Sequence, residues 1–170
     1  MLCAIWRLHI NGKLMQKAGA LLGRRAYSRG ELQVRLAQAG PPHEIEEVLA
    51  HLQDVGLLND AEYAYNFASR RINEMAWGDG KVYHSLVRRQ ISPHLAEAAM
   101  QRVHQEVSEE LVLCRYLERK ACRGRLPSDR KAIRKLIAHL RSRGFSENLI
   151  WRCLRERIPA AGWRRFETGD

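Results

Sequence analysis

The chain has 170 residues, of which 45% are apolar and 28% are charged, so it is long enough to bury one hydrophobic core or several connected ones. A run of about 18 apolar residues, which a membrane-spanning helix requires, is missing from the sequence. The partly apolar start "MLCAIWRLHINGK" is interrupted by Arg7 and His9 and is followed by no signal-peptide cleavage site. We therefore expect a cytoplasmic protein.

The formal net charge of +10 is unevenly distributed along the chain. Residues 1–114 carry 13 Lys and Arg against 13 Asp and Glu, whereas residues 115–170 carry 16 against 6. Such an asymmetry indicates an anionic partner, either nucleic acid or an acidic protein surface, although a basic surface that serves only solubility is the other interpretation.

The first third of the chain is predicted to form three short helices. After an apolar pattern over 14–22, Ser28 and Glu31 have the spacing of a capping box that starts a second helix. We expect Gly40 to end that helix in a left-handed conformation. Pro42 then suits the first turn of a third helix, which Gly56 ends. The apolar faces of the second and third helices are Leu32, Leu36 and Ala39, and Ile45, Val48, Leu49 and Leu52.

The joint "GLLNDAEYAYNF" at 56–67 carries two leucines where a linker between independent domains is usually polar. Asn59 has the spacing of a helix cap, so that Leu58 and Tyr63 form a predicted hydrophobic staple. Leu57 follows Gly56 and is predicted to pack on the end of the preceding helix, as in a Schellman turn. The sequence therefore predicts a rigid corner between packed helices.

The same pattern recurs twice downstream. "LAQAGPPHEI", "LVRRQISPHL" and "LRSRGFSENL" each place apolar residues at both ends of a helix break, at offsets of 50 and 54 residues. Ser92 and Ser146 are predicted to begin helices after the breaks, and Ser108 is predicted to precede the first helix of the last repeat. In the second copy Gln90 stands where the other two copies have Gly40 and Gly144.

These patterns predict an all-α fold of nine short helices in three tandem three-helix repeats, elongated and curved because each repeat must share apolar surface with its neighbour. The expected repeats are 14–56, 57–107 and 108–158, the last of them basic, between an extension at 1–13 and a tail at 159–170. A monomer is expected, since no surplus apolar stripe is left over.

No catalytic, cofactor-binding or metal-binding constellation stands out. His43 and Glu44 lack the second histidine of a zinc-binding H-E-x-x-H motif, and the G-x-G-K fragment near 80 lacks the strand of a phosphate loop. The four cysteines form no C-x-x-C pair and are expected to be buried, reduced thiols.

Two stretches together resemble the RecX family of regulatory proteins. "YSRGELQVRLAQAG" is similar to the family's S-R-x-E-L-x-x-x-L-x-x-x-G stretch, and "GLLNDAEYAYNF" is similar to its G-L-L-D-D-x-x-F-A stretch. "GDGKVYHSLVRRQIS" and "IRKLIAHLRSRGFSENLI" resemble the later repeats more loosely, so that the resemblance covers about 14–157. Gln90 and Ser85 depart from the usual glycine and Glu-Leu of the second repeat.

The resemblance implies a modulator of the RecA recombinase that is not an enzyme and needs no cofactor. Such a protein binds the RecA filament on single-stranded DNA and mainly inhibits its strand exchange, its ATP hydrolysis and its coprotease role in the SOS response. The RecA filament is thus the expected partner, with single-stranded DNA as an additional candidate. A general nucleic-acid-binding module independent of RecA and a helical-repeat scaffold for another protein are the alternatives.

Candidate contact residues are arginines and lysines at helical spacing. Two sets in the last repeat each form a basic ridge suited to phosphates, and two arginine pairs in the middle repeat suit acidic groups of a protein partner. An ordinary solvated face is the competing interpretation of each. The candidates are Arg115, Arg119 and Arg123; Lys131, Arg134 and Lys135; Arg70 and Arg71; and Arg88 and Arg89.

Overall fold

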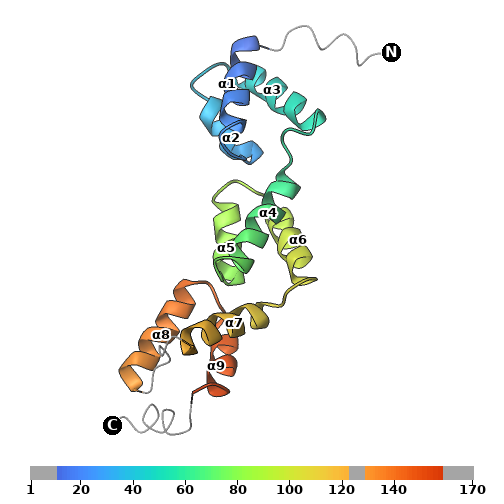
Figure 1. The fold of residues 1–170 in the computed structure, drawn as a ribbon. Helices are drawn as coiled ribbons and strands as arrows, with labels where there is room; N and C mark the ends of the chain where they lie inside the picture. The colour runs from blue at the N-terminus through green and yellow to red at the C-terminus, as the bar shows by residue number, and fades with distance from the viewer. Residues whose placement is uncertain (1–10, 123–128, 159–170) are drawn as a thin grey trace.

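A computed structural model describes residues 11–122 and 129–158, and within these ranges the chain forms nine α-helices and no strand (Figure 1). The predicted all-α class with three three-helix repeats is confirmed. The helices are α1 Gly12–Leu22, α2 Arg29–Leu36, α3 Pro42–Asp54, α4 Asp60–Asn73, α5 Asp79–Val87, α6 Pro93–His104, α7 Glu109–Ala121, α8 Arg130–Ser142 and α9 Glu147–Arg155.

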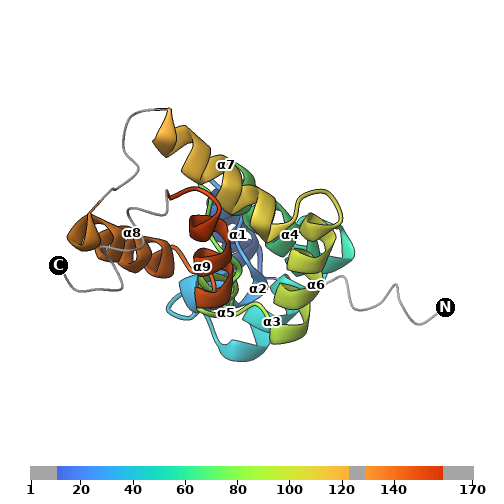
Figure 2. The ribbon, with the colours of Figure 1, turned by 90° about the horizontal axis from the view of Figure 1, so that it is seen from below.

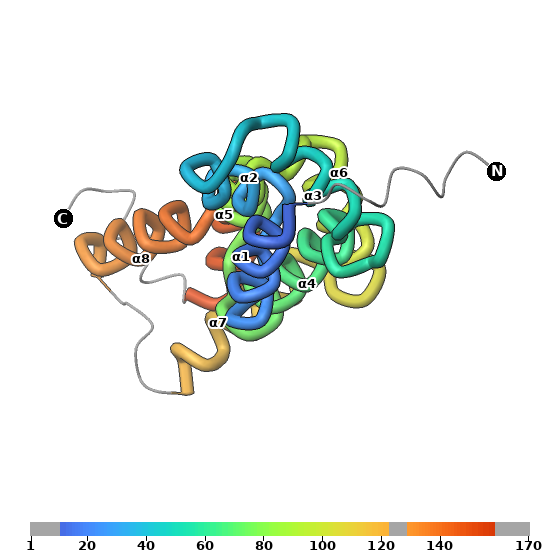
Figure 3. The backbone as a smooth tube through the Cα atoms, turned by 90° about the horizontal axis from the view of Figure 1, so that it is seen from above, coloured from blue at the N-terminus to red at the C-terminus, as the bar shows by residue number. Residues whose placement is uncertain are grey.

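The three repeats, named here the first (α1–α3), second (α4–α6) and third (α7–α9) units, follow one another along a long, curved body (Figure 1). Helices α2, α5 and α8 lie along one side of this body, and α3 and α6 lie along the other. The two views along the long axis show that α8 projects sideways from the rest of the molecule (Figures 2 and 3). The exact repeat boundaries stay a prediction.

Polar caps begin most of the helices, as their sequences predict. Ser28 accepts a hydrogen bond from the Glu31 N–H while the Glu31 side chain accepts one from the Ser28 N–H, which completes the capping box of α2. The side chains of Asn59, Ser92 and Ser108 likewise cap α4, α6 and α7. Ser146 occupies the cap position of α9, but its hydroxyl makes no capping hydrogen bond.

The predicted end of α2 at Gly40 is wrong. The helix ends at Leu36, Ala39 is exposed, and Gly40 is absent from the residues with positive φ. Glycine is needed there for space, because a Cβ on Gly40 would lie 2.9 Å from Leu14 Cδ1. Gly40 therefore allows the chain after α2 to pass close to α1, and it does not reverse the backbone.

The joint between α3 and α4 is built around one of its two leucines. Gly56 has the expected left-handed conformation, with φ of +74°, but Leu57 is 66% exposed and makes no Schellman contact, so that prediction is wrong. Leu58 is buried instead, and its N–H donates to the Leu52 carbonyl at 3.0 Å. Leu58 packs in the core of the first unit and Tyr63 packs against the core of the second. The staple between them stays a prediction.

Two hydrophobic cores run through the described residues. One contains the buried apolar residues from Leu14 to Leu58 and belongs to the first unit. The other is continuous from Ala64 to Ile158 and is shared by the second and third units, where α4 contacts α7 directly. The expected sharing of apolar surface thus holds between the second and third units, and the first unit has a core of its own.

The cysteines meet the prediction of buried thiols only in part. Cys153 is buried with its Sγ 3.9 Å from Cys114 Sγ, Cys122 is exposed, and Cys3 lies outside the described residues. Burial, followed by the proximity of Cys114, raises the pKa of the Cys153 thiol to about 12. In the ranges 11–122 and 129–158, no helix is long and apolar enough to cross a membrane.

Candidate nucleic-acid and partner interface

The first and second units meet where the start of α2 touches the end of α5, a contact named here the first joint. The Ser28 hydroxyl donates a hydrogen bond to the Arg89 carbonyl. Gly30 lies so close to Gln90 that a Cβ on Gly30 would be 2.4 Å from the Gln90 Cβ. The small side chains at the start of α2 therefore allow two helix ends to approach head to tail.

Polar groups surround the first joint. The Arg29 N–H donates to Asp60 Oδ1 at 2.7 Å, and the Tyr63 hydroxyl donates to Glu31 Oε2 at 3.0 Å. Burial alone would raise the pKa of Glu31, but hydrogen bonds from Arg25, the Ser28 N–H and Tyr63 outweigh it and lower the pKa below its ordinary value. The carboxylate of Glu31 thus accepts hydrogen bonds from both units, from Arg25 and Ser28 of the first and from Tyr63 of the second.

The second and third units repeat this geometry at the start of α5 and the end of α8, named here the second joint. The Gly78 N–H donates to the Arg143 carbonyl at 2.8 Å, as the Ser28 hydroxyl does to the Arg89 carbonyl in the first joint. The Gly80 N–H donates to the Gly144 carbonyl at 3.2 Å. The two joints therefore occupy equivalent places in the repeat. Their acceptors, the carbonyls of Arg89 and Arg143, are 54 residues apart, which is the offset predicted between the second and third breaks.

Gln90 takes the place of Gly144 without changing the backbone. Gln90 has φ of +61° and Gly144 has φ of +90°, both in the left-handed region. The next residue in each case donates back into the helix, from the Ile91 N–H to the Leu86 carbonyl at 3.2 Å and from the Phe145 N–H to the Leu140 carbonyl at 3.3 Å. The departure at Gln90 thus keeps the turn and adds a side chain against Gly30.

An ionic cluster of Asp79, His104 and Glu109 lies at the start of α5, beside the second joint. His104 Nε2 lies 2.9 Å from both carboxylate oxygens of Asp79, and the Asp79 N–H donates to Glu109 Oε1 at 3.0 Å. Burial lowers the pKa of His104, but the Val107 carbonyl and the charge of Asp79 outweigh it and raise the pKa above its ordinary value. Burial, then the charge of Asp79, raises the pKa of Glu109.

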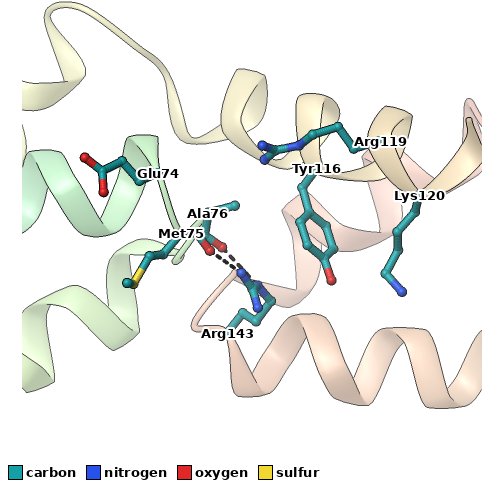
Figure 4. Close-up of a pocket in the computed structure, with 7 residues that line it drawn as sticks. All are labelled: Glu74, Met75, Ala76, Tyr116, Arg119, Lys120 and Arg143. Atoms are coloured by element: carbon teal, nitrogen blue, oxygen red, sulfur yellow. Dashed lines mark hydrogen bonds between the residues drawn. The ribbon is translucent and has the colours of Figure 1, made fainter. Parts of the chain in front are cut away.

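A cleft of about 290 Å³ lies beside the second joint, between the end of α4, the middle of α7 and the end of α8 (Figure 4). Arg143 spans it, since its Nε donates to the Ala76 carbonyl at 3.1 Å and its Nη2 to the Met75 carbonyl. The same guanidinium lies 4.7 Å from the centre of the Tyr116 ring. Arg119 and Lys120 complete the basic wall, and Glu74 lies at the opposite edge.

A second cleft, of about 600 Å³, adjoins the first along α7. It is lined by Arg115, Arg119 and three further residues, Asn73, Glu118 and Cys122. Arg119 belongs to both clefts, so the predicted ridge on α7 lines a hollow between the second and third units. Arg123, the third member of that ridge, lies outside the described residues.

The predicted ridge on α8 has a different environment. Lys131, Arg134 and Lys135 are exposed, and they line neither the two clefts along α7 nor the clefts that Arg88 borders at the two joints. Their helix is the one that projects from the body (Figure 2). The two clefts along α7 are therefore lined by the α7 ridge without the α8 ridge.

One arginine of each pair in the second unit lies over the ring of Phe67. Arg70 pairs with Glu74 on the surface, Nε to Oε2, at 3.1 Å. The guanidinium of Arg71 lies 5.1 and 4.7 Å from the rings of Phe67 and Trp77, and that of Arg89 lies 4.7 Å from Phe67. These contacts give Arg71 and Arg89 packing roles.

Arg88 is exposed and borders a cleft at each joint. In the first joint it lies with Arg25, Arg35 and Glu31, and in the second with residues that include Lys81 and Arg141. Of the four candidate arginines in the second unit, Arg88 is thus the one best placed to meet a partner.

Sequence reasoning missed several residues beside the second joint. His139 is exposed and stacks on Tyr116, with Nε2 2.8 Å from the Tyr116 hydroxyl. Burial, then the positive charges of Arg143, Lys120 and Lys81, lowers the pKa of His139. The equivalence of Arg143 with Arg89 in the repeat was a usable signal, but the convergence of Lys81 and Lys120 on His139 depends on packing between units.

Comparisons with known proteins agree with this architecture. The family model described as "RecX, third three-helix domain" matches residues 108–154. The chain is 32% identical to the Regulatory protein RecX of Leptothrix cholodnii over 143 residues, which cover 84% of this chain and 87% of that protein. It is 31% identical to the Regulatory protein RecX of Pseudomonas fluorescens over 135 residues, which cover 79% of this chain and 84% of that protein.

Solved structures show the same fold. The crystal structure of RecX from Lactobacillus salivarius superposes with a TM-score of 0.72 at 23% identity, covering 85% of this chain and 94% of that one. The repeat architecture, the match to the third domain model and the relatives above 30% identity agree with one another. The chain belongs to the RecX family of regulatory proteins.

Proposed function

We propose that this protein binds the RecA filament formed on single-stranded DNA and restrains its recombinase, ATPase and coprotease activities in DNA repair and the SOS response. Membership of a family of regulatory proteins is the observation that carries this proposal. The proposed mode of action is binding, without catalysis by the protein itself.

The shape of the molecule supports binding to a filament. Three units in a row present a long surface, over which several weak contacts to neighbouring subunits add through effective concentration. The second and third units share one core and so form a stiff element of that surface. Both a position within the filament groove and a cap on its end are compatible with such a body.

The distribution of charge supports a contact with the DNA in that filament. The excess of 16 Lys and Arg over 6 Asp and Glu after residue 114 places the positive charge in the third unit and beyond. An elongated body with one basic end can contact the recombinase along its length and the strand at that end.

Hydrolysis of ATP by RecA on single-stranded DNA tests the proposal directly. The protein is titrated at substoichiometric ratios to RecA, with DNA in excess over all sites on both proteins and at two salt concentrations. The filament depends on contacts between its subunits. We therefore expect the rate of ATP hydrolysis to decrease at molar ratios well below one molecule of this protein per RecA.

The alternative function is a nucleic-acid-binding module that acts without RecA, which the basic third unit would also suit. That module predicts salt-sensitive binding to DNA with no fall in hydrolysis under excess DNA. Such a result would refute filament regulation while leaving the family assignment intact.

A further inference from the structure

We propose that the two adjoining clefts along α7 form one groove, which holds the phosphodiester backbone of single-stranded nucleic acid. We call it the α7 groove, lined by Arg115, Arg119, Lys120, Tyr116 and Arg143. This inference deepens the proposed function and rests on it, since it names the place where the strand within the filament meets the protein.

Continuity of the groove comes from one helix. Arg115 and Arg119 are one turn of α7 apart, so their side chains lie about 6 Å from each other along the helix axis. Arg119 borders both clefts, and Lys120 extends the basic wall into the smaller one (Figure 4). A chain of anionic groups lying along α7 would therefore meet successive cations.

Within the part of the chain that the structure describes, the cations of the groove have no acidic partners. Among residues 11–122 and 129–158, no ion pair involves Arg115, Arg119 or Lys120. The two acidic residues that border the groove are engaged elsewhere, Glu74 with Arg70 at 3.1 Å and Glu118 with Arg157 at 3.7 Å. The groove thus retains an uncompensated positive charge that an anionic ligand would neutralise.

The cations that line the groove also act on the neighbouring ring of His139. Its pKa is lowered by burial and then by Arg143, Lys120 and Lys81, three cations from three different helix ends or faces. A potential that disfavours the protonated imidazole favours an anion at the same place. Geometry and electrostatics therefore agree on the sign of the ligand.

An aromatic surface beside these cations favours nucleic acid over an acidic peptide. The exposed His139 ring stacks on Tyr116 at a centroid distance of 6.2 Å, next to the cationic wall. Bases of a single strand stack on such rings, whereas an acidic peptide supplies carboxylates without planar groups. A duplex keeps its bases paired, so that only a single strand can use both the cations and the ring.

A matched pair of variants tests the groove. Arg119→Gln with Lys120→Gln removes two adjacent charges from the groove, and Arg134→Gln with Lys135→Gln removes two adjacent charges from α8 outside it. All four side chains lie in the third unit. The probe is fluorescein-labelled oligodeoxythymidylate, whose anisotropy gives the Kd at several salt concentrations, and circular dichroism verifies that both variants keep the helicity of the wild type.

We expect the groove variant to bind the oligonucleotide about tenfold more weakly and to flatten the slope of log Kd against log salt by about 1.4, since each phosphate contact to a single strand contributes about 0.7. The α8 variant should change the slope by less than half of that. His139→Ala should weaken binding while leaving the slope unchanged. Unlabelled poly-glutamate at equal charge should displace the oligonucleotide poorly.

Three results would overturn the groove. The first is that the wild-type protein does not bind the oligonucleotide. The second is that the α8 variant loses as much affinity as the groove variant, or more. The third is that poly-glutamate displaces the labelled oligonucleotide as effectively as unlabelled oligonucleotide does. The RecA hydrolysis assay separates this failure from failure of the proposed function. Wild-type inhibition that persists undiminished in the groove variant refutes the groove alone, whereas absence of wild-type inhibition refutes filament regulation and leaves the oligonucleotide result to decide the groove.

Discussion

The two joints of this molecule share one backbone geometry but are stabilised by different means. In both, the start of the middle helix of one unit donates a hydrogen bond to the end of the middle helix of the next, to Arg89 in the first joint and to Arg143 in the second. Behind the second joint the apolar core continues from one unit into the other. Behind the first, the cores are separate, and hydrogen bonds from Arg29 to Asp60 and from Tyr63 to Glu31 connect the two units.

The difference teaches that repetition of a contact does not repeat its energetics. An apolar core contributes in proportion to the area removed from water, whereas hydrogen bonds between units largely exchange for hydrogen bonds with water. We therefore expect the second and third units to unfold together and the first unit to unfold more independently. The second and third units would then form a stiff basic element, and the first unit could change its orientation or unfold when the protein binds a partner.

The largest expected effect concerns Leu58, which closes the core of the first unit. Leu58→Asp places a charge at a position that is 3% exposed and should cost about 4 kcal/mol, because the carboxylate has no partner there. Leu57→Asp is the matched control at a position that is 66% exposed, and it should be nearly neutral.

Urea unfolding followed by circular dichroism measures both leucine variants. If the first unit is independent, Leu58→Asp should give an early partial transition followed by a second transition at the wild-type midpoint. A single transition shifted as a whole would show that all three units unfold together and would remove the distinction between the joints.

The next effect compares how tightly the joints are packed. A Cβ on Gly78 would lie 2.4 Å from the Phe145 backbone nitrogen, so Gly78→Ala should lower the free energy of unfolding by about 3 kcal/mol. The obstacle is backbone, so no second side-chain substitution can relieve it. Gly30→Ala meets the Gln90 side chain instead. Its cost should fall to below about 1 kcal/mol in a Gln90→Gly background, because the obstacle is then removed.

Double-mutant cycles from urea unfolding measure this coupling. A Gly30→Ala cost that is the same with and without the Gln90 side chain would contradict the packing described for the first joint. An innocuous Gly78→Ala would contradict that described for the second.

Gln90→Gly alone should stabilise the protein by about 1 kcal/mol. The glutamine sits at φ of +61°, a conformation that glycine adopts without strain, and its side chain is exposed. Thermal unfolding gives the sign, and Gln38→Gly, at an exposed position without positive φ, is the control that should not stabilise. A destabilised Gln90→Gly variant would mean that the contact of Gln90 with Gly30 outweighs the backbone strain.

The smallest effect is a pH dependence of opposite sign at the two joints. The lowered pKa of Glu31 means that its contribution is present above the unfolded pKa of about 4.3 and is lost as the pH falls through the lower folded pKa. The raised pKa of His104 means that its contribution is present below the unfolded pKa of about 6.5 and is lost as the pH rises through the folded pKa. Partial exposure of His104 should keep its effect below about 1 kcal/mol.

Glu31→Gln and His104→Gln separate the two pH effects in urea unfolding at pH 4, 6 and 8. The Glu31 variant should lose part of the acid sensitivity of the wild type. The His104 variant should lose part of the decline in stability between pH 6 and pH 8. The same pH profile in both variants as in the wild type would show that neither joint is stabilised by these charges.

Local signals in the sequence predicted the helices well because they depend on neighbouring residues only. The capping box of Ser28 and Glu31, the caps at Asn59, Ser92 and Ser108, and the left-handed Gly56 all follow from contacts within a few positions. The repeat offsets likewise placed Gln90 and Gly144 at equivalent positions, and the family resemblance was carried by the same residues.

The errors and omissions arose where a residue's role depends on another unit or on a distant helix. Gly40 is a spacer against Leu14, and Leu58 rather than Leu57 closes the first core. The α7 ridge borders two clefts that the α8 ridge does not line. The sequence by itself determined the helical elements, their repetition and the basic third unit. Only the tertiary structure decided which cations gather beside His139, because the head-to-tail packing of α5 on α8 brings Lys81 and Arg143 together across 62 residues of chain.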